Sequence, residues 1–289
     1  MKVYLLGTGG PEITLHRQGS AVLIEVNDQK LLFDAGRSVL QRLFECSVSI
    51  ADVSQIFFTH MHSDHIEGLP NLWMTGWFSH GRTRPLDIWG PSGTKRMIDG
   101  MREMYRFDLA NRIDPRHPPE ALETRVTEYS EGVIYERNGV VITAFEVWHD
   151  DGNPAFGFRI AHAGRSVVLS GDTTYHENVI QFAQETDLLV HNVIAVSDEL
   201  AQLPKLQSVL AKLTTPEQAA DIFRRTAPRL AVYTHVIKKG LANGNHDSVL
   251  IERTRQAGYA GPLEVGLDRM TIDIGESVNV IPPPAIAVD

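Results

Sequence analysis

Three histidines and one aspartate within six residues are the feature of this sequence with the clearest chemical meaning. They follow an apolar, strand-like run, and the segment reads His60-Met61-His62-Ser63-Asp64-His65. Imidazole nitrogens and carboxylate oxygens are ligand atoms that zinc and similar divalent cations accept. On an extended segment the side chains of His60 and His62 point the same way, so both can reach one metal ion. Asp64 and His65 begin a turn into a helix and can face a neighbouring metal ion.

Three further potential ligands each follow a strand-like segment. Sites in α/β proteins gather at strand ends, because the sheet holds the adjoining loop residues in place. A single histidine or aspartate at a strand end is more often structural, but together with the cluster these three are expected to bind metal. The predicted metal ligands are therefore His60, His62, Asp64, His65, His149, Asp172 and His235.

Two residues are candidates for a catalytic role beyond metal binding. Asp64 can both bind metal and orient the attacking nucleophile, and it can then carry a proton. His191 ends the apolar segment Leu188–Val190. It either lines the site as a proton donor or is a hydrogen-bonded structural histidine, and both interpretations stay open.

No other nucleophile or cofactor motif competes with the metal cluster. Ser170 precedes a glycine but lacks the Gly-x-Ser-x-Gly pattern of a serine hydrolase. The glycines of Gly7-Thr8-Gly9-Gly10 lack the full dinucleotide fingerprint. We expect them to let the backbone turn close to the site.

Composition and charge narrow the range of functions. Apolar residues make up 43% of the 289 residues, so the chain can bury a large core without a disulfide or a structural metal. The 27 lysines and arginines against 36 aspartates and glutamates give a net charge of −9. This acidic balance argues mildly against a nucleic-acid substrate, because proteins that bind phosphate backbones usually carry a basic surface, although a local basic patch stays open. A small-molecule substrate is expected instead.

The cellular location is expected to be the cytoplasm. The single cysteine, Cys46, excludes a disulfide within the chain. The first residues lack the pattern of a signal peptide, and no run approaches the roughly 20 apolar residues that a membrane span needs. No membrane association is therefore expected. A homodimer is expected only because dimers are the commonest oligomers.

Strands and helices alternate along the whole chain, which predicts an α/β fold. Helices are expected at about 37–45, 66–72, 92–106 with Ser92 as N-cap, 177–185, and 216–226 behind a Thr215 capping box. The expected strands are Val3–Leu6, Ala21–Val26, Lys30–Phe33, Ile56–Thr59, Leu86–Trp89, Val133–Tyr135, Val140–Val147, Phe156–Ala161, Ser166–Leu169, Leu188–Val190 and Leu230–Tyr233. No linker divides the chain. We predict one domain, 1–289, with two pseudo-symmetric halves at about 1–145 and 146–289.

Two segments have alternative interpretations. The apolar cluster at 73–78, which contains Trp73 and Trp77, is either helical core or an apolar wall of the substrate pocket. The segment Asp198–Leu213 has a helix-like pattern and is either a surface helix or a lid over the site.

The sequence resembles a known superfamily at several motifs. The segment His60–His65 is similar to the His-x-His-x-Asp-His signature of the metallo-β-lactamase superfamily. The ribonuclease Z and arylsulfatase-like branch is resembled at further motifs, which occur in the expected order between residue 3 and about residue 240. These are Leu6-Gly7-Thr8-Gly9-Gly10-Pro11, Phe33-Asp34-Ala35-Gly36, Ile66-Glu67-Gly68-Leu69-Pro70, Gly90-Pro91-Ser92-Gly93-Thr94 and Ser170-Gly171-Asp172-Thr173.

This resemblance implies an αββα sandwich with two divalent metal ions at one edge, between the sheets. It assigns His60, His62 and His149 to one metal and Asp64, His65 and His235 to the other, with Asp172 bridging them. Zn²⁺ is the first expectation for both ions. Mn²⁺ and Fe²⁺ stay open, because histidine and aspartate suit all three.

Two departures from the ribonuclease pattern shape the expected substrate. The ribonuclease has His-Glu where this chain has His191-Asn192, and it has a phosphate-contacting histidine where this chain has only Ala211–Thr214. Lys212 could replace that histidine in charge alone. These departures and the acidic composition argue against transfer-RNA processing.

The expected function is that of a dinuclear metal-dependent hydrolase. A hydroxide that bridges the two metals would cleave an ester, lactone, amide or related bond of a small molecule. The alternative is a phosphodiesterase that acts like ribonuclease Z or on a cyclic nucleotide or other small phosphodiester. The complete ligand set argues against a one-iron oxygenase and against a sensor that has lost catalysis.

Overall fold

Two mixed β-sheets form the centre of the protein in the computed structural model, which describes residues 1–115, 117, 119–241 and 247–284. The first sheet has the strand order β15-β14-β1-β2-β3-β4-β5-β6. Its strands are β1 (Lys2–Gly7), β2 (Ala21–Val26), β3 (Gln29–Phe33), β4 (Gln55–Phe57), β5 (Leu86–Gly90), β6 (Thr124–Glu128), β14 (Met270–Ile274) and β15 (Val278–Ile281). Pairing is antiparallel from β15 to β3 and parallel from β3 to β6.

The second sheet repeats this arrangement with the order β13-β12-β11-β10-β9-β8-β7. Its strands are β7 (Gly132–Arg137), β8 (Val140–Val147), β9 (Ala155–His162), β10 (Arg165–Leu169), β11 (Leu188–Val196), β12 (Leu230–Lys239) and β13 (Leu263–Val265). Pairing is antiparallel from β7 to β10 and parallel from β10 to β13. Since β14 and β15 return to the first sheet, that sheet contains both ends of the described chain. The predicted halves at about 1–145 and 146–289 stay a prediction.

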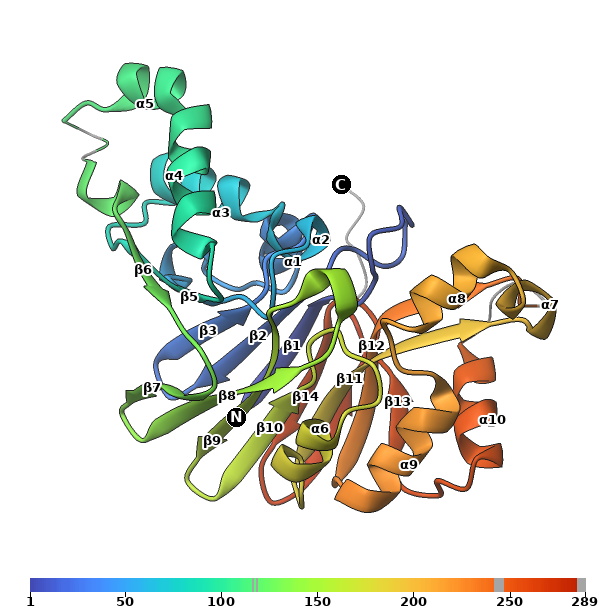
Figure 1. Ribbon diagram of the computed structural model, residues 1–289. Coiled ribbons are helices and arrows are strands. Elements are labelled where there is room, and N and C mark those ends of the chain that lie inside the picture. Colours follow the sequence, from blue (N-terminus) through green and yellow to red (C-terminus); the bar gives the residue numbers. More distant parts are fainter. Residues whose placement is uncertain (116, 118, 242–246, 285–289) are drawn as a thin grey trace.

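Helices cover the outer face of each sheet (Figure 1). On the side of the first sheet lie α1 (Val39–Glu45), α2 (Ser63–Ile66), α3 (Leu69–Phe78), α4 (Thr94–Met104) and α5 (Arg106–Arg112). On the side of the second sheet lie α6 (Glu177–Phe182), α9 (Pro216–Thr226) and α10 (Ser248–Gln256). Two short helices, α7 (Asp198–Ala201) and α8 (Pro204–Leu210), pack near the ends of β11 and β12. This is the predicted αββα sandwich.

The core explains why these segments form these layers. One apolar cluster lies between the sheets and takes side chains from both, among them Phe33, Phe57 and Phe158. Two further clusters lie between each sheet and its helices. Strands buried on both faces are apolar over most of their length, as the sequence of β11 shows. Trp73 and Trp77 are buried in the layer of the first sheet, so the 73–78 segment is helical core.

Of two helix caps predicted from the sequence, one is confirmed and the other is wrong. Thr215 forms the predicted capping box at the start of α9. The prediction of Ser92 as the N-cap of α4 is wrong, because Gly93 occupies that position with a positive φ of 100°. The backbone N–H groups of Gly93 and Lys95 instead donate to the carboxylate of Glu128, each at 2.9 Å. A distant carboxylate thus replaces the local cap.

Two strands run further than their sequence pattern indicates. β11 and β12 continue past the predicted ends at Val190 and Tyr233. Their pairing shifts by one residue beyond Asn192, so β12 carries a bulge there. His235 lies at this bulge with a φ of 45°. A β-bulge redirects a side chain without ending the strand, and this one turns His235 toward the edge of the sandwich. Among the described residues, no helix is long and apolar enough to cross a membrane.

Candidate metal centre

The seven predicted ligands come from separate segments that meet at one edge of the two sheets. His60 and His62 follow β4, and the adjoining helix α2 contains Asp64 and His65. His149 follows β8, Asp172 follows β10, and His235 lies at the bulge of β12. Their ligand atoms form three overlapping groups in which all atoms lie within 4.8 Å of one another. The groups are His60, His62 and His149; His60, His65 and Asp172; and Asp64, His65 and His235.

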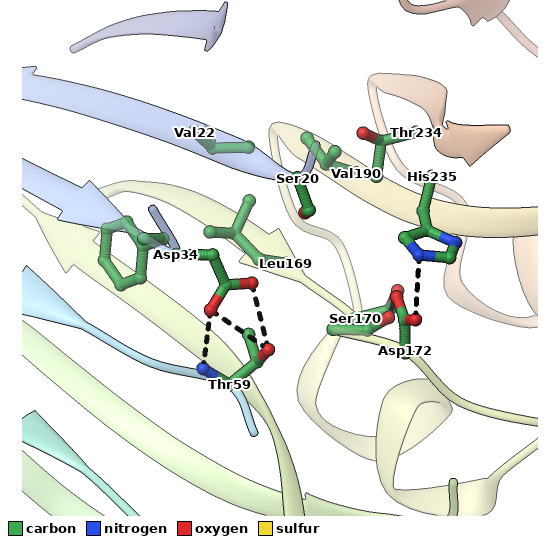
Figure 2. A pocket seen from close by; sticks show the side chains of 12 residues that line it. Ser20, Val22, Asp34, Thr59, Leu169, Ser170, Asp172, Val190, Thr234 and His235 are labelled. Carbon is green, nitrogen blue, oxygen red and sulfur yellow. Dashed lines mark hydrogen bonds and ion pairs between the residues drawn. The ribbon is translucent and has the colours of Figure 1, made fainter. Parts of the chain in front are cut away.

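Asp172 occupies the middle of this arrangement. Its Oδ2 atom lies 3.0 Å from His235 Nε2, 3.5 Å from His65 Nε2 and 3.6 Å from His149 Nε2. Figure 2 shows its contact with His235. One carboxylate therefore faces histidines of both predicted metal positions.

The remaining contacts fall on either side of Asp172. On one side, His62 Nδ1 lies 3.2 Å from His149 Nε2. On the other side, Asp64 Oδ2 lies 3.3 Å from His235 Nε2 and 3.7 Å from His65 Nε2. Asp64 is also almost fully buried, at 6% exposed. The seven side chains therefore form one cluster, and the division of ligands between two metal ions stays a prediction.

A carboxylate outside the proposed ligand set, that of Asp34, orients two of the histidines, His65 directly and His60 through Thr59. Asp34 Oδ2 accepts a hydrogen bond from His65 Nδ1 at 2.7 Å. Asp34 also accepts from the backbone N–H of Thr59 at 2.8 Å, and the Thr59 hydroxyl lies 2.9 Å from His60 Nδ1 (Figure 2 shows Asp34 and Thr59). These contacts hold each Nδ1 and leave each Nε2 free to face the centre, which is how metal-binding histidines are commonly oriented.

His149 is oriented by the main chain. Its Nδ1 lies 2.9 Å from the carbonyl oxygen of Lys212, which accepts the hydrogen bond. Its neighbour Gly152 leaves room for three imidazoles. A Cβ atom at Gly152 would lie 2.3 Å from His149 Cδ2 and 2.9 Å from His62 Cε1, so this position accepts only glycine without rearrangement.

Burial and mutual charge displace the pKa values of these groups. Burial by itself would raise the pKa of Asp172, but the imidazoles of His235 and His65 outweigh it and hold that pKa well below its usual range. Burial lowers the pKa of His60 well below the usual value for histidine, and the neighbouring His65 adds to the effect. Although burial opposes it, the charge of Asp172 helps to raise the pKa values of His65 and His235, so a binding cation would have to displace protons from these two imidazoles.

Two unpaired nitrogen atoms support the fit to a metal ion. His60 Nε2 and His65 Nε2 are buried, and neither has a hydrogen-bond partner among the described residues. A buried polar atom without a partner is costly and calls for an explanation. Divalent cations bound among these imidazole nitrogens and carboxylate oxygens would give both atoms a partner. The residues present therefore fit a divalent metal.

Two cavities lined by described residues adjoin the cluster. A small one of about 20 Å³ lies beneath it, and Asp34, Thr59, Ser170 and Thr234 are among its lining residues (Figure 2). A larger one of about 160 Å³ opens beside the ligands. It is lined by Pro11, His62, Asp64, His149, Asp151, Asp172, Val209, Lys212, Leu213, His235 and Ile237. Val209, Lys212 and Leu213 belong to the segment Asp198–Leu213, and its role as a lid stays a prediction.

His191 is the predicted site residue that the structure does not bring to the cluster. It lies fully buried within β11, and its ring centroid is 6.0 Å from that of Phe223 on α9. Its Nδ1 lies 2.8 Å from the carbonyl oxygen of Asn192. Burial lowers the pKa of His191 to about 4. His191 lines neither cavity beside the cluster, and its catalytic role stays a prediction.

Sequence reasoning missed the roles of Asp34, Thr59 and Gly152. The sequence indicates Asp34 only as part of a motif, although it directly follows the end of β3 and so obeys the same strand-end rule as the ligands. Thr59 precedes His60 and carries a hydroxyl, which is a usable signal for an orienting contact. Gly152 has no signal, because its role depends on three histidines that meet only in the folded protein.

Comparison with known proteins places the chain in a family. A family model described as Anti-Pycsar protein Apyc1 matches residues 1–215. Ribonuclease Z from Mycolicibacterium gilvum (strain PYR-GCK) is 32% identical over 289 residues, which covers 98% of this chain and 99% of the relative. Ribonuclease Z from Mycobacterium avium (strain 104) is 34% identical over 283 residues, with 94% and 99% covered.

Solved structures show the same fold. The metallo-β-lactamase fold protein YhfI from Bacillus subtilis matches with a TM-score of 0.72 at 19% identity, over 93% of this chain and 98% of that one. The short form of human tRNase Z matches with a TM-score of 0.70 at 22% identity, over 95% and 100%. Zn²⁺-bound PqqB from Methylobacterium extorquens matches with a TM-score of 0.58 at 14% identity, over 95% and 100%.

These relatives correct the expected partner. They are named as ribonucleases, which act on RNA, so the expectation that the substrate is a small molecule and that nucleic acid is unlikely is wrong. The error comes from the net charge, which sums the whole surface and does not describe the groups around one pocket. With the metal cluster, the fold and these matches together, the chain belongs to the metallo-β-lactamase superfamily and to the family described as Anti-Pycsar protein Apyc1, as a metal-dependent hydrolase similar to ribonuclease Z.

Proposed function

We propose that this chain is a two-metal phosphodiesterase that hydrolyses the phosphodiester bond of an RNA substrate. The observation that carries the proposal is the placement of Asp172 between the two groups of histidines, at 3.0 Å from His235 Nε2 and 3.6 Å from His149 Nε2. The name of the ribonuclease Z relatives supports the bond class and the substrate. The expectation of an ester, lactone or amide has no comparable support.

The proposed cofactors are two divalent cations, with Zn²⁺ first and Mn²⁺ or Fe²⁺ as alternatives. The presence of Zn²⁺ in the structurally similar PqqB supports this order. The proposed ligands of one ion are His60, His62 and His149, those of the other are Asp64, His65 and His235, and Asp172 serves both. When bound, such a pair lowers the pKa of water and stabilises negative charge on the transferred phosphoryl group.

The chain's own residues then have distinct tasks. Asp34 and the carbonyl oxygen of Lys212 hold the imidazoles of His65 and His149 in one orientation, at 2.7 Å and 2.9 Å. Asp64 lines the larger cavity and is proposed to orient the attacking water and accept its proton. The apolar side chains of Val209, Leu213 and Ile237 form a wall of that cavity, which excludes bulk water beside the ligands.

Other elements of the proposal rest on the sequence alone. These are a cytoplasmic location, a homodimer, and the single domain with two halves. A proton-donor role for His191 has no supporting contact among the described residues, because its ring packs against Phe223.

A substrate panel tests the proposed function. The metal-loaded protein is incubated with a short single-stranded RNA, bis(p-nitrophenyl) phosphate, a cyclic mononucleotide and p-nitrophenyl acetate, each with and without a chelator. The proposal predicts chelator-sensitive cleavage of RNA and bis(p-nitrophenyl) phosphate with little hydrolysis of the acetate. Dominant acetate hydrolysis would refute the bond class, and cleavage of the cyclic mononucleotide without RNA would refute the substrate.

Two ligand variants connect that activity to the site. His62→Ala and Asp172→Ala should lose bound metal and abolish turnover while the far-ultraviolet circular dichroism spectrum is unchanged. His80→Ala is the matched control, since His80 is exposed at the end of α3. Full activity in either ligand variant would contradict the assignment.

A further inference from the structure

The larger cavity beside the metal cluster is lined by one lysine side chain. Among the described residues that line it, Lys212 is the only lysine or arginine. Three carboxylates line the same space, those of Asp64, Asp151 and Asp172. Asp64 and Asp172 face histidines of the cluster. Among the described residues of this lining, Lys212 therefore contributes the one ammonium group that can meet an anionic substrate.

The backbone at Lys212 and in the two residues that follow it is held firmly. Its carbonyl oxygen accepts the hydrogen bond from His149 Nδ1 at 2.9 Å. The next residue, Leu213, is buried at 3% exposed in the cluster around Ile194 and Ile237. The Thr214 carbonyl oxygen accepts a backbone hydrogen bond from Ile194 at 2.9 Å. A side chain on so fixed a backbone reaches a defined part of the cavity.

The ammonium group itself is held only loosely. Lys212 Nζ lies 2.6 Å from Asp151 Oδ2 and 4.0 Å from Asp150 Oδ2. The Asp151 side chain is 62% exposed, and that of Lys212 is 23% exposed. Ion pairs with an exposed partner contribute little, because water and salt screen them. An anion that enters the cavity can therefore replace Asp151 at little cost.

We propose that Lys212 is a specificity-determining residue that binds a non-bridging phosphate oxygen of the substrate, and that the substrate takes the place of Asp151 as its partner. This inference rests on the proposed phosphodiesterase function. Lys212 then has two separate roles, one for its main chain and one for its side chain. Its main chain orients His149, and its side chain recognises the charge of the substrate.

The division between main chain and side chain makes the proposal testable. Replacing the side chain leaves the carbonyl contact to His149 in place, so Lys212→Met should keep its metal content. It should weaken binding of inorganic phosphate to the metal-loaded protein about tenfold, since a charge-assisted contact is lost. KM for bis(p-nitrophenyl) phosphate should rise by a similar factor, while kcat stays within about twofold.

Three further variants separate this role from a general charge effect. Lys212→Arg keeps the charge and should bind phosphate within about threefold of the unmodified protein. Lys205→Met removes an exposed charge from the same α8 region, away from the cavity lining, and should change nothing. Asp151→Asn frees Lys212 from its partner and should tighten phosphate binding about threefold.

The readouts distinguish two kinds of failure. Isothermal titration calorimetry with inorganic phosphate needs no turnover, so it tests Lys212 even if no phosphodiester is cleaved. If the unmodified protein cleaves no phosphodiester, the proposed function is refuted. If Lys212→Met nevertheless binds phosphate more weakly than the unmodified protein, the contact between Lys212 and phosphate is still supported. Absent phosphate binding in the unmodified protein, or equal binding in Lys212→Met, would overturn the role of Lys212.

Discussion

Replacing Asp34 by asparagine should weaken metal binding at both positions of the cluster, although Asp34 itself is not a proposed ligand. Its carboxylate accepts a hydrogen bond from His65 Nδ1 at 2.7 Å and contacts Thr59, whose hydroxyl lies 2.9 Å from His60 Nδ1. In Asp34→Asn, one oxygen can still accept from Thr59, but the new NH₂ group faces His65. His65 then loses its acceptor and is pushed toward the tautomer that protonates Nε2.

The size of the effect follows from what such orienting contacts contribute in other metal sites. Losing one typically weakens metal affinity by 10- to 100-fold, or about 1.4–2.7 kcal/mol. We expect the larger value at the position that includes His65, where the contact is direct. The smaller value is expected at the position that includes His60, where Thr59 intervenes.

Competition with a chromophoric chelator, monitored over two equivalents of Zn²⁺, measures both affinities. Thr59→Val is the matched comparison and should weaken chiefly the position that contains His60. Asp28→Asn, an exposed aspartate in the turn before β3, should leave both affinities unchanged. Thermal unfolding of the metal-free proteins checks that each variant folds. If folded Asp34→Asn binds both ions within about threefold of the unmodified protein, the orienting role is refuted.

Three other predictions follow from the same geometry. Gly152→Ala should weaken metal binding about tenfold, the lower end for a disturbed orienting group, because its Cβ would lie 2.3 Å from His149 Cδ2. The control is Gly100→Ala, in a helix where a Cβ meets no other atom within 4 Å. Equal metal affinities of Gly152→Ala and the unmodified protein in chelator competition would contradict the packing argument. Removing metal should lower the midpoint of thermal unfolding, since a ligand that binds only the folded state stabilises it, and an unchanged midpoint after dialysis against chelator would count against a tight site. The pKa of His191 is lowered from 6.5 to about 4 in the fold by burial, so the unfolded chain binds the extra proton between these values. The unfolding free energy of the metal-free protein should therefore fall as the pH drops through this window, by up to about 3 kcal/mol, and His191→Gln should reduce that slope; identical slopes in denaturant titrations would refute the assignment.

The meeting of the proposed ligands at one edge of the sheets was predictable, because these residues lie where the sequence pattern is strongest. Four of the ligands share the short segment His60–His65, and His149 and Asp172 follow strands whose apolar patterns are clear. The αββα sandwich followed from the resemblance, and the alternation of helices and strands agreed with it.

Features that depend on distant contacts escaped sequence analysis. The strand containing His235 was expected to end before it, whereas β12 continues through a bulge whose register shift exists only in the paired sheet. The start of α4 is capped by Glu128 at the end of β6, so the sequence near α4 does not indicate this cap. The orienting contacts of Asp34 and Lys212 likewise join residues that are far apart in the sequence.

The substrate was misjudged for a different physical reason. A net charge of −9 describes the whole surface. The cavity beside the metal cluster is lined by three carboxylates and Lys212, and two of these carboxylates are proposed metal ligands whose charge bound cations would offset. Whole-chain charge is therefore a poor guide to the substrate of one pocket.

The most direct test of the central claim is cleavage of a single-stranded RNA while Zn²⁺ is added stepwise to the metal-free protein. The account predicts little cleavage without metal, a rise that saturates at two equivalents per chain, and loss of activity when chelator is added. Saturation at one equivalent would contradict the two-metal site, and no RNA cleavage at any metal content would contradict the proposed substrate.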